Sequence, residues 1–532
     1  SGGNGYENGG WRGDLNLTKT DGWRDDTGYD RKSGTLRWDH FIGDSTLLKT
    51  VLGFSEIDQE TGANSPLVRG DYKHDPTRNY LPIAFREVSA LRLSTSYERD
   101  MGDSLLSITP YVRDNSMDLL ASFALRFDPS IAKTENRSYG LMAKWRQDFV
   151  PLRARLIAGV DLDVSPGSRR ENRVDPTTRG AGASEEFIAY RVGPRIYDYD
   201  VEYRGISPYL HGEISPTEKL RLTAGLRYDD MRFDFDNKFV GDVIRVDSSF
   251  YGQSSDSRVS FRRATPKLGA TYALGVQTHL FASYNQGFRA PSESQLFRPS
   301  RTSIRDRNGV LDVPRSLAAA RALAQSALEL DAIKAEQYEL GVRGVAAGVS
   351  YDLVAYELTK RDDIVSQRDP VTTQTIATNA GKTRHRGVEL GLGAPVVRNL
   401  RLDVALSYAK HEFVDWTTNQ GDFSGNEQQS APRFISNARL TWTPTDALRA
   451  QFEWIGIGSY WLDDANTVKY GGHNVFNLRG NFALTPKVSL FGSVNNLTDR
   501  RYADSAQLST NSTPAYSPAL PRTVIAGVEA KW

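Results

Sequence analysis

Polar and apolar residues alternate along most of this chain with a period of two residues. Between residues 400 and 409, aliphatic side chains and one tyrosine occupy the even positions, while polar or small side chains occupy the odd ones. The same alternation recurs at 220–229 and at 448–454. Because successive side chains of a strand point to opposite faces, this pattern predicts β-strands whose two faces meet different solvents.

The length of the runs and their connections indicate how the strands are arranged. Several runs reach about 10 to 15 residues, which is long enough for a tilted strand to cross a bilayer, and many end in Tyr or Trp, which settle at membrane boundaries. Short and long connections alternate strictly, as an up-and-down barrel with two different rims requires. A soluble sandwich or propeller does not require this alternation. The short connections are predicted at 43–44, 101–103, 150–151, 215–217, 275–276, 346–348, 394–397, 444–446 and 485–486. The long connections are predicted at 57–86, 165–199, 238–257, 288–333, 414–430 and 498–520.

These observations predict an all-β fold, a transmembrane antiparallel up-and-down β-barrel with long external loops. Nine short turns join eighteen strands, and one further strand at each end, near 11–18 and 522–532, brings the count to about 20. Bacterial barrels have even strand numbers. The clearest helical pattern is the Ala-rich segment 314–330, which lies inside a predicted long loop.

Composition excludes several other classes of protein. No segment contains the roughly 18 consecutive apolar residues of a membrane helix. The chain has no Cys, so disulfide scaffolds, thiolate zinc sites and cysteine catalysis are excluded. Its formal net charge of +1 lacks the basic excess of nucleic-acid-binding domains, so no nucleic acid is expected as a partner.

Four segments in the correct order resemble the TonB-dependent outer-membrane receptors of the siderophore-receptor type. They are the strings 283–297 (SYNQGFRAPSESQLF), 334–344 (KAEQYELGVRG), 379–393 (NAGKTRHRGVELGLG) and 495–502 (NNLTDRRY). The terminal run 522–532 alternates and ends on an aromatic residue, as outer-membrane barrels commonly do. The residues that match the family's motifs, and for which we expect a structural role, are Gly287, Phe288, Arg289, Pro291, Glu339, Gly387, Glu389, Asn495, Asn496 and Trp532.

The resemblance covers nearly the whole chain but differs from the family at its front. Receptors of this family begin with a plug domain preceded by a TonB-binding segment. No segment of residues 1–532 resembles either of these two parts. Residues 10–31 resemble the second hairpin of the family's barrel. We therefore expect residues 1–532 to be the barrel of such a receptor, with the plug and the first hairpin outside this sequence, and with about 20 strands of a total of 22.

Apparent catalytic motifs are better explained by strands and turns. The strings 43–47 (GDSTL) and 102–106 (GDSLL) imitate the nucleophile block of a serine hydrolase, and 71–74 (DYKH) its partner block. Nucleophile elbows need a strand-turn-helix context, whereas each Ser here begins an alternating strand. The seven His residues show no HxH or HExxH spacing, and no calcium-loop pattern occurs. We expect no enzyme activity, no resident metal and no bound cofactor.

Ligand binding is expected in the long external loops. The chain has 50 arginines against 16 lysines, and arginines gather in the loops with aromatic residues between them. Guanidinium groups bind carboxylate, catecholate and phosphate oxygens in a fork, which suits a bulky anionic chelate. Such arginines also suit lipopolysaccharide phosphates, and this alternative stays open for each of them. The candidate ligand-binding residues are Tyr190, Arg191, Arg195, Tyr197, Arg298, Arg301, Arg305, Tyr460 and Trp461.

The resemblance implies a function, a location and a set of partners. It implies an outer-membrane receptor of a Gram-negative bacterium that imports a ferric siderophore, with iron present only in the chelate substrate. Its implied partners are the plug domain, the TonB-ExbB-ExbD motor acting through the plug, and the lipid and lipopolysaccharide of the outer membrane. Haem is disfavoured because no NPNL-like box follows in 298–332. Receptors for haem, cobalamin or an oligosaccharide, a passive porin and an outer-membrane hydrolase remain the alternatives.

Overall fold

Twenty-one antiparallel strands form one continuous sheet in a computed structural model of the chain. The structure describes residues 1–532 except 63–64, 369–374, 419, 510–511 and 532. The strands of the sheet are β1 (Gly2–Tyr6), β2 (Gly9–Thr20), β3 (Tyr29–Ile42), β4 (Thr46–Glu60), β6 (Phe85–Asp100), β7 (Ser104–Leu120), β8 (Ser130–Phe149), β9 (Ala154–Arg179), β10 (Glu186–Ile214), β11 (Leu220–Asn237), β14 (Ser257–Ala273), β15 (Thr278–Arg289), β16 (Ile333–Ala346), β17 (Val349–Arg368), β18 (Thr375–Val397), β19 (Leu400–Asp415), β22 (Phe434–Thr445), β23 (Leu448–Ile457), β26 (His473–Thr485), β27 (Val488–Asn495) and β30 (Thr523–Ala530).

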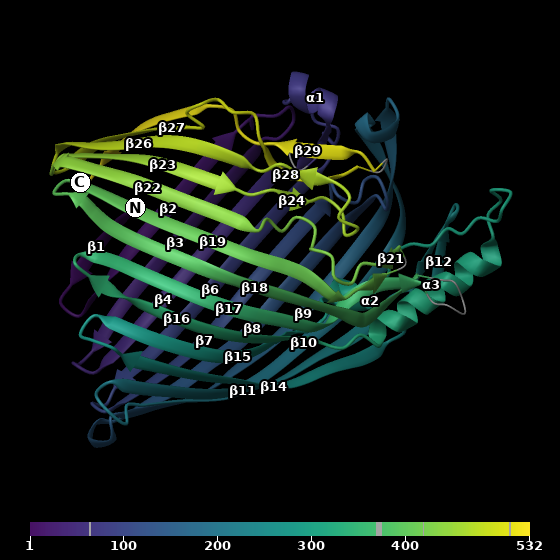
Figure 1. Ribbon diagram of the computed structural model, residues 1–532. Coiled ribbons are helices and arrows are strands. Elements are labelled where there is room, and N and C mark those ends of the chain that lie inside the picture. Colours follow the sequence, from purple (N-terminus) through teal and green to yellow (C-terminus); the bar gives the residue numbers. More distant parts are fainter. Residues whose placement is uncertain (63–64, 369–374, 419, 510–511, 532) are drawn as a thin grey trace.

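The sheet is an up-and-down meander that curls into a transmembrane barrel, which confirms the predicted fold class. Each strand pairs with the next sheet strand along the chain, from β1–β2 to β27–β30. Both chain ends lie at the end of the molecule opposite α3, and the strands of the first half pass behind those of the second half (Figure 1). One strand more is present than the 20 predicted, because the Gly-rich β1 has no alternating side chains that would reveal it.

The predicted turns match the gaps between strands, with one exception. At 394–397 the strand β18 continues, and the turn follows at 398–399. The long loop predicted over 165–199 is wrong. Strands β9 and β10 continue through most of it as a two-stranded ribbon whose turn lies at 180–185. Within the ribbon, side chains such as Val174, Ile196 and Tyr197 are buried against external segments, so its sequence lacks the regular alternation of the other strands.

The two faces of the sheet differ in polarity, as the sequence predicts. On the outer face, aliphatic side chains such as Leu226, Leu268 and Leu340 are more than half exposed. On the inner face, the carboxylate of Glu453 accepts hydrogen bonds from Arg439 at 2.9 Å and Arg479 at 2.7 Å. A buried carboxylate is costly unless it is paired. The inner wall is therefore built from satisfied polar groups, while the outer wall presents hydrocarbon.

Glycines in the inner wall make room for tyrosine rings from neighbouring strands. A Cβ atom on Gly140 would lie 2.1 Å from the Tyr111 ring, and one on Gly159 would lie 2.4 Å from the Tyr209 ring. Gly387, one of the motif residues, lies under Tyr356 in the same way. At these positions glycine is required by the close approach of a ring to the backbone.

Smaller elements form the external connections. They are β5 (Leu67–Val68), α1 (Arg69–His74), β12 (Val243–Val246), β13 (Ser249–Gly252), α2 (Glu293–Phe297), α3 (Val313–Leu328), β20 (Thr417–Thr418), β21 (Gly421–Asp422), β24 (Tyr460–Trp461), β25 (Lys469–Tyr470), β28 (Ala503–Leu508) and β29 (Pro514–Pro518). The helix predicted at 314–330 is confirmed as α3. None of the helices in the described part of the chain has the length and hydropathy needed to cross a membrane.

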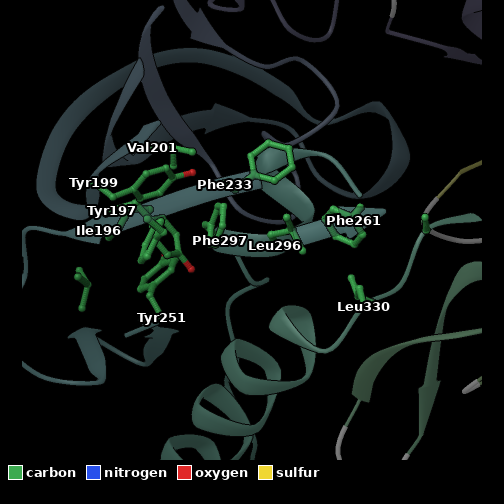
Figure 2. Packing of buried hydrophobic residues seen from close by; sticks show 13 residues of the cluster. Ile196, Tyr197, Tyr199, Val201, Phe233, Tyr251, Phe261, Leu296, Phe297 and Leu330 are labelled. Carbon is green, nitrogen blue, oxygen red and sulfur yellow. The ribbon is translucent and has the colours of Figure 1, made fainter. Parts of the chain in front are cut away.

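Packed apolar clusters occur among the external segments. The largest joins β10, β11 and β14 to the segment 290–332, with Tyr197, Tyr199, Phe235 and Phe297 at its centre. Figure 2 shows Tyr197, Tyr199 and Phe297 between the strands and α3. The rings of Phe235 and Phe297 stack with centroids 4.3 Å apart. The external connections are thus folded onto the barrel.

The second and the last external connections of the chain meet. Strand β5 pairs with β29, and the Tyr72 ring lies 4.8 Å from the Tyr516 ring. No pairing joins β1 to β30 among the residues that the structure describes. Contacts between external segments therefore bridge the region where the sheet's two edge strands lie.

Candidate functional site

A cavity of about 1180 Å³ lies between the barrel wall and the external segment 290–332. Its wall comes from the outer ends of β7, β8 and β9 and from the connection 121–129, and its other side comes from α2 and α3. The residues that line the cavity include Phe123, Asp128, Arg169, Glu171, Arg298, Arg301 and Arg315. This volume is that of a pocket for a ligand of drug size or larger.

Two capped helices shape the segment 290–332. The Ser292 side chain accepts a hydrogen bond from the Gln295 amide and the Gln295 side chain accepts one from the Ser292 amide, which forms a capping box at the start of α2. Asp312 caps α3 through the Arg315 amide at 3.1 Å. The inner side of α3 is rich in alanine, so the helix lies close to β13, where a Cβ atom on Gly252 would lie 2.1 Å from the Ala320 carbonyl oxygen.

Arg298 fastens this segment to the barrel wall. Its guanidinium lies 2.6 Å from a carboxylate oxygen of Glu171 and 2.8 Å from one of Asp128. Arg169 lies 2.7 Å from the other Glu171 oxygen, and Ser130 donates to Glu171 at 2.6 Å. The Glu171 side chain is fully buried. Burial opposes its ionisation, but the hydrogen bond and charge of Arg298, together with Arg169, lower the pKa of Glu171 to about 2.

The lining of the cavity carries a surplus of positive charge. Four arginines (Arg169, Arg298, Arg301 and Arg315) and two carboxylates (Asp128 and Glu171) are among the lining residues, so the arginines of the lining outnumber its carboxylates by two. The carboxylates are engaged mainly by Arg169 and Arg298. Arg301 is 35% exposed, lies 3.8 Å from Asp128 and donates to the Phe127 carbonyl oxygen at 2.6 Å. The cavity is therefore suited to an anionic ligand that carries hydrogen-bond acceptors.

A second recess of about 550 Å³ adjoins the cavity through Arg169. It faces the lumen and is lined by the ion pair of Arg113 with Asp163 at 2.8 Å and by Tyr199, which hydrogen bonds to Glu293. Burial raises the pKa of Glu293, in spite of the Tyr199 hydrogen bond. Polar side chains thus continue from the cavity toward the lumen.

The structure brings two of the predicted ligand-binding residues into the cavity, Arg298 and Arg301. Tyr197 lies beside them but is buried. Its hydroxyl donates to the Pro299 carbonyl oxygen at 2.6 Å, and Arg298 lies over its ring at 5.4 Å. Tyr197 therefore positions the segment that carries the two arginines.

The other predicted ligand-binding residues lie outside the cavity lining. Arg191 is 84% exposed and pairs with Asp175, Arg195 pairs with Asp198, and Tyr190 lies partly exposed on β10, so these three belong to a strand and not to a loop. Arg305 is exposed and donates to the Gly309 carbonyl oxygen. Tyr460 is buried against Tyr470, and Trp461 lies under Lys469 at 4.0 Å. A ligand-binding role for each of these residues stays a prediction.

Sequence reasoning did not find the connection 121–129, which supplies part of the cavity wall. Phe123 lines the cavity with 80% of its surface exposed, and Met117 and Leu119 extend this apolar side. The sequence indicates this connection only through the largely apolar segment 121–127 (ASFALRF), which lies between two alternating strands. Exposed aromatic residues beside arginines offer stacking as well as charge.

The residues that match the family motifs support strands and turns. Phe288 packs against the largest apolar cluster, Pro291 is buried, and Arg289 is exposed at the end of β15. Glu339 accepts from Ser283 at 3.1 Å, and Gly287 and Glu389 lie within strands β15 and β18. Asn495 ends β27, and Asn496 adopts a φ of 52° and accepts from the Arg500 amide at 2.9 Å. Trp532 lies outside the described residues.

Within the described residues, no group of three or more His, Cys, Asp or Glu side chains is arranged to hold a metal ion. The candidate site is therefore defined by guanidinium, hydroxyl and aromatic groups. Its fold and position are those of a membrane barrel of the receptor class, in which external segments fold over the lumen and enclose a binding cavity.

Comparison with known proteins identifies the family. The profile of the family described as "TonB dependent receptor-like, beta-barrel" matches residues 1–497. The chain belongs to this family of TonB-dependent receptors, whose members are β-barrels of the Gram-negative outer membrane.

Individual relatives are distant in sequence. The chain is 22% identical to the rhizobactin receptor of Rhizobium meliloti (strain 1021) over 392 residues, 70% of this chain and 50% of that protein. It is 26% identical to the pesticin receptor of Yersinia enterocolitica over 364 residues, 68% of this chain and 48% of that protein. The chain thus spans about half of the length of these curated relatives.

Solved structures share the fold. The siderophore receptor PiuA from Acinetobacter baumannii superimposes with a TM-score of 0.75 at 14% identity, covering 100% of this chain and 78% of that one. The ferric citrate transporter FecA in its unliganded form superimposes with a TM-score of 0.77 at 17% identity, covering 99% and 74%. These relatives are transport receptors and not enzymes.

Proposed function

We propose that this chain is the barrel of an outer-membrane receptor that imports a ferric siderophore, with iron carried as part of the substrate. The observation that carries the proposal is the external cavity, whose arginines outnumber its carboxylates by two, placed over a polar lumen. The printed names of relatives, which include a rhizobactin receptor and a ferric citrate transporter, support the same class of cargo.

The chemistry of the cavity favours an anionic chelate over the alternatives. Guanidinium groups match the paired oxygens of carboxylates and catecholates, and the hydroxyls of Ser294, Ser300 and Ser303 add hydrogen-bond partners. Haem needs an axial ligand, and no histidine is among the described residues that line the cavity. The cavity therefore supports the siderophore proposal better than a haem receptor.

Transport would be driven from the inner side of the barrel. By family membership, the TonB-ExbB-ExbD motor acts through a plug domain that occupies the lumen. The paired charges of the inner wall, such as Arg113 with Asp163, offer hydrogen bonds to such a plug. The motor, the plug and a location in the outer membrane are parts of this proposal.

Growth on single iron sources tests the proposal. Deleting the gene in an iron-limited strain should abolish growth on one class of ferric siderophore, and the intact gene should restore it. Growth on ferrous iron or on haem serves as the control and should not change. Undiminished growth of the deletion strain on every ferric chelate, together with a defect on cobalamin or an oligosaccharide, would contradict the proposal.

A cationic patch on the outer face is proposed to contact lipopolysaccharide phosphates. Glu412 is surrounded by Arg384 at 2.5 Å, Arg386 at 3.0 Å and Lys410, and Glu357 lies 4.0 Å from Arg386, which leaves an excess of one positive charge. The patch lies on the same face of the sheet as Tyr408, which is 55% exposed. It is farther than Tyr408 from the short turn that precedes β19. This is the level expected for phosphate groups above an aromatic boundary.

Replacing Arg384, Arg386 and Lys410 together by serine should therefore reduce the lipopolysaccharide that co-purifies with the barrel by at least about twofold, because three phosphate-binding cations are lost. Bound lipopolysaccharide can be measured by native mass spectrometry. The inward-facing variant Arg439→Ser is the control. An equal amount of lipopolysaccharide on both variants would refute this assignment.

A further inference from the structure

Two histidines from neighbouring strands lie with their imidazole nitrogens in contact. His385 of β18 and His411 of β19 are paired directly across the sheet, and their Nδ1 atoms are 2.8 Å apart. The rings lie 5.1 Å apart at an angle of 56°. They are 26 residues apart in the chain, so no short motif in the sequence reveals the pair.

Both side chains face the inside of the barrel. The outer face of β18 carries Val388 and Leu392, both exposed apolar residues at even positions, and the outer face of β19 carries Tyr408. His385 and His411 occupy the odd positions, with the buried Ala409 and Phe413 on the same face. The pair lies beyond Tyr408, on the side of the external segments, where water and solutes can reach the wall.

The neighbouring groups hold the two rings in place. The Nε2 atom of His385 lies 3.2 Å from the Thr383 hydroxyl, which fixes the orientation of that ring. Lys360 pairs with Asp363 at 2.7 Å nearby on β17, so its charge is already compensated. The Glu427 charge acts on His411 from the connection after β19. A side-chain partner on the second ring nitrogen is the arrangement that orients metal-binding imidazoles.

The spacing of the two nitrogens matches a metal ligand pair. Two nitrogens bound at right angles, each about 2.0 Å from a metal ion, are about 2.8 Å apart. This is the cis arrangement of square-planar and tetragonal sites, which Cu²⁺ prefers. Imidazole is a good ligand for Cu²⁺, and Cu²⁺ binds such donors more tightly than other divalent first-row ions.

We propose that His385 and His411 form a two-histidine site for a divalent transition-metal ion, with Cu²⁺ the preferred ion and water in the remaining positions. The site is separate from the arginine-lined cavity and does not depend on which chelate the receptor imports. Each metal–nitrogen bond uses one imidazole lone pair, and the hydrogen between the two Nδ1 atoms moves to the Nε2 atom of the ring that carries it, so both imidazoles stay neutral.

Copper binding to the purified, folded chain in detergent tests the proposal. With glycine as a competitor in the buffer, calorimetry at pH 7 should show one Cu²⁺ bound per chain, and electron paramagnetic resonance should show two nitrogen ligands. His385→Gln and His411→Gln should each weaken binding at least about tenfold and remove one nitrogen ligand. His279→Gln is the matched control. The cross-strand partners of His279 are Ala273 and Arg343, so it has no second imidazole beside it and should bind no copper.

Three results would overturn the assignment. They are the absence of Cu²⁺ binding by the unchanged chain, equal affinity in the His385→Gln and His411→Gln variants, and a spectrum with only oxygen ligands. Heat-modifiable electrophoretic mobility verifies that each variant still forms the barrel. Because the readout is metal binding and not growth on siderophores, failure of this site leaves the import proposal unaffected.

Discussion

Replacing Arg298 by alanine should release the segment 290–332 from the barrel wall. The substitution removes the guanidinium that contacts both Glu171 and Asp128, and it leaves the fully buried Glu171 with Arg169 and the Ser130 hydroxyl. Breaking a buried ion pair by removing one partner costs about 3 to 5 kcal/mol. We expect a non-specific protease to cleave the variant between α2 and α3 at least about a hundredfold faster than the unchanged chain.

The exposed Arg305 on the same segment is the control for this experiment. It donates to the Gly309 carbonyl oxygen, so Arg305→Ala should leave the cleavage rate within about twofold of the unchanged chain. Equal protection of Arg298→Ala and the unchanged chain would show that the apolar contacts of α2 and α3 hold the segment without the ion pairs.

The same contact predicts a response to pH. The pKa of Glu171 is lowered from 4.5 to about 2, so the stabilisation is fully present above pH 4.5 and is lost as the pH falls toward 2. At pH 4, where a free glutamate is partly protonated, the segment should remain protected from an acid protease. Loss of protection already at pH 4 would contradict the assigned ion pair.

Arg301 should dominate the binding of the anionic chelate in the external cavity. Arg301 lines the cavity, is 35% exposed, and lies 3.8 Å from the Asp128 carboxylate, so its guanidinium can contact a bound anion. A hydrogen bond to a charged group contributes about 1.5 to 3 kcal/mol, so Arg301→Ala should raise the Kd for the ferric siderophore that supports growth by about 10-fold to 100-fold. Tryptophan fluorescence quenching by the ferric chelate measures this Kd.

Two further variants separate charge from structure in this prediction. Arg301→Lys keeps the positive charge and should recover part of the affinity, although it loses the planar fork of donors. Arg191→Ala removes an arginine that is 84% exposed and lies outside the cavity lining, and it should leave the Kd unchanged. A Kd that rises equally in Arg191→Ala and Arg301→Ala would contradict the location of the site.

The fold could be predicted where one strand face meets lipid. The alternation at 400–409 predicts β19, because the bilayer imposes an apolar side chain at every second position. In the ribbon of β9 and β10, buried side chains such as Val174, Ile196 and Tyr197 pack against external segments, so no regular alternation marks 165–199. The strand β1 consists largely of glycine and polar residues, so it carries no pattern.

The site could be predicted only in part. Arginine-rich loops pointed to Arg298 and Arg301, because guanidinium chemistry is visible in the sequence. Which arginines share a cavity depends on how the segment 290–332 folds onto β9, and that contact joins residues more than 100 positions apart. Tyr460 and Trp461 have the same aromatic chemistry in the sequence, yet both belong to β24, outside the cavity lining, and Tyr460 packs in a different apolar cluster.

The account depends on a barrel with hydrocarbon outside and water inside, and cysteine labelling tests this most directly. The chain has no native Cys, so Ala405→Cys and Leu406→Cys each introduce one thiol, at adjacent positions of β19. In barrels reconstituted into vesicles, a charged water-soluble maleimide should label the inward Ala405→Cys, and a probe confined to the lipid should label the outward Leu406→Cys. The reverse pattern, or equal labelling of both positions by the charged maleimide, would contradict the account.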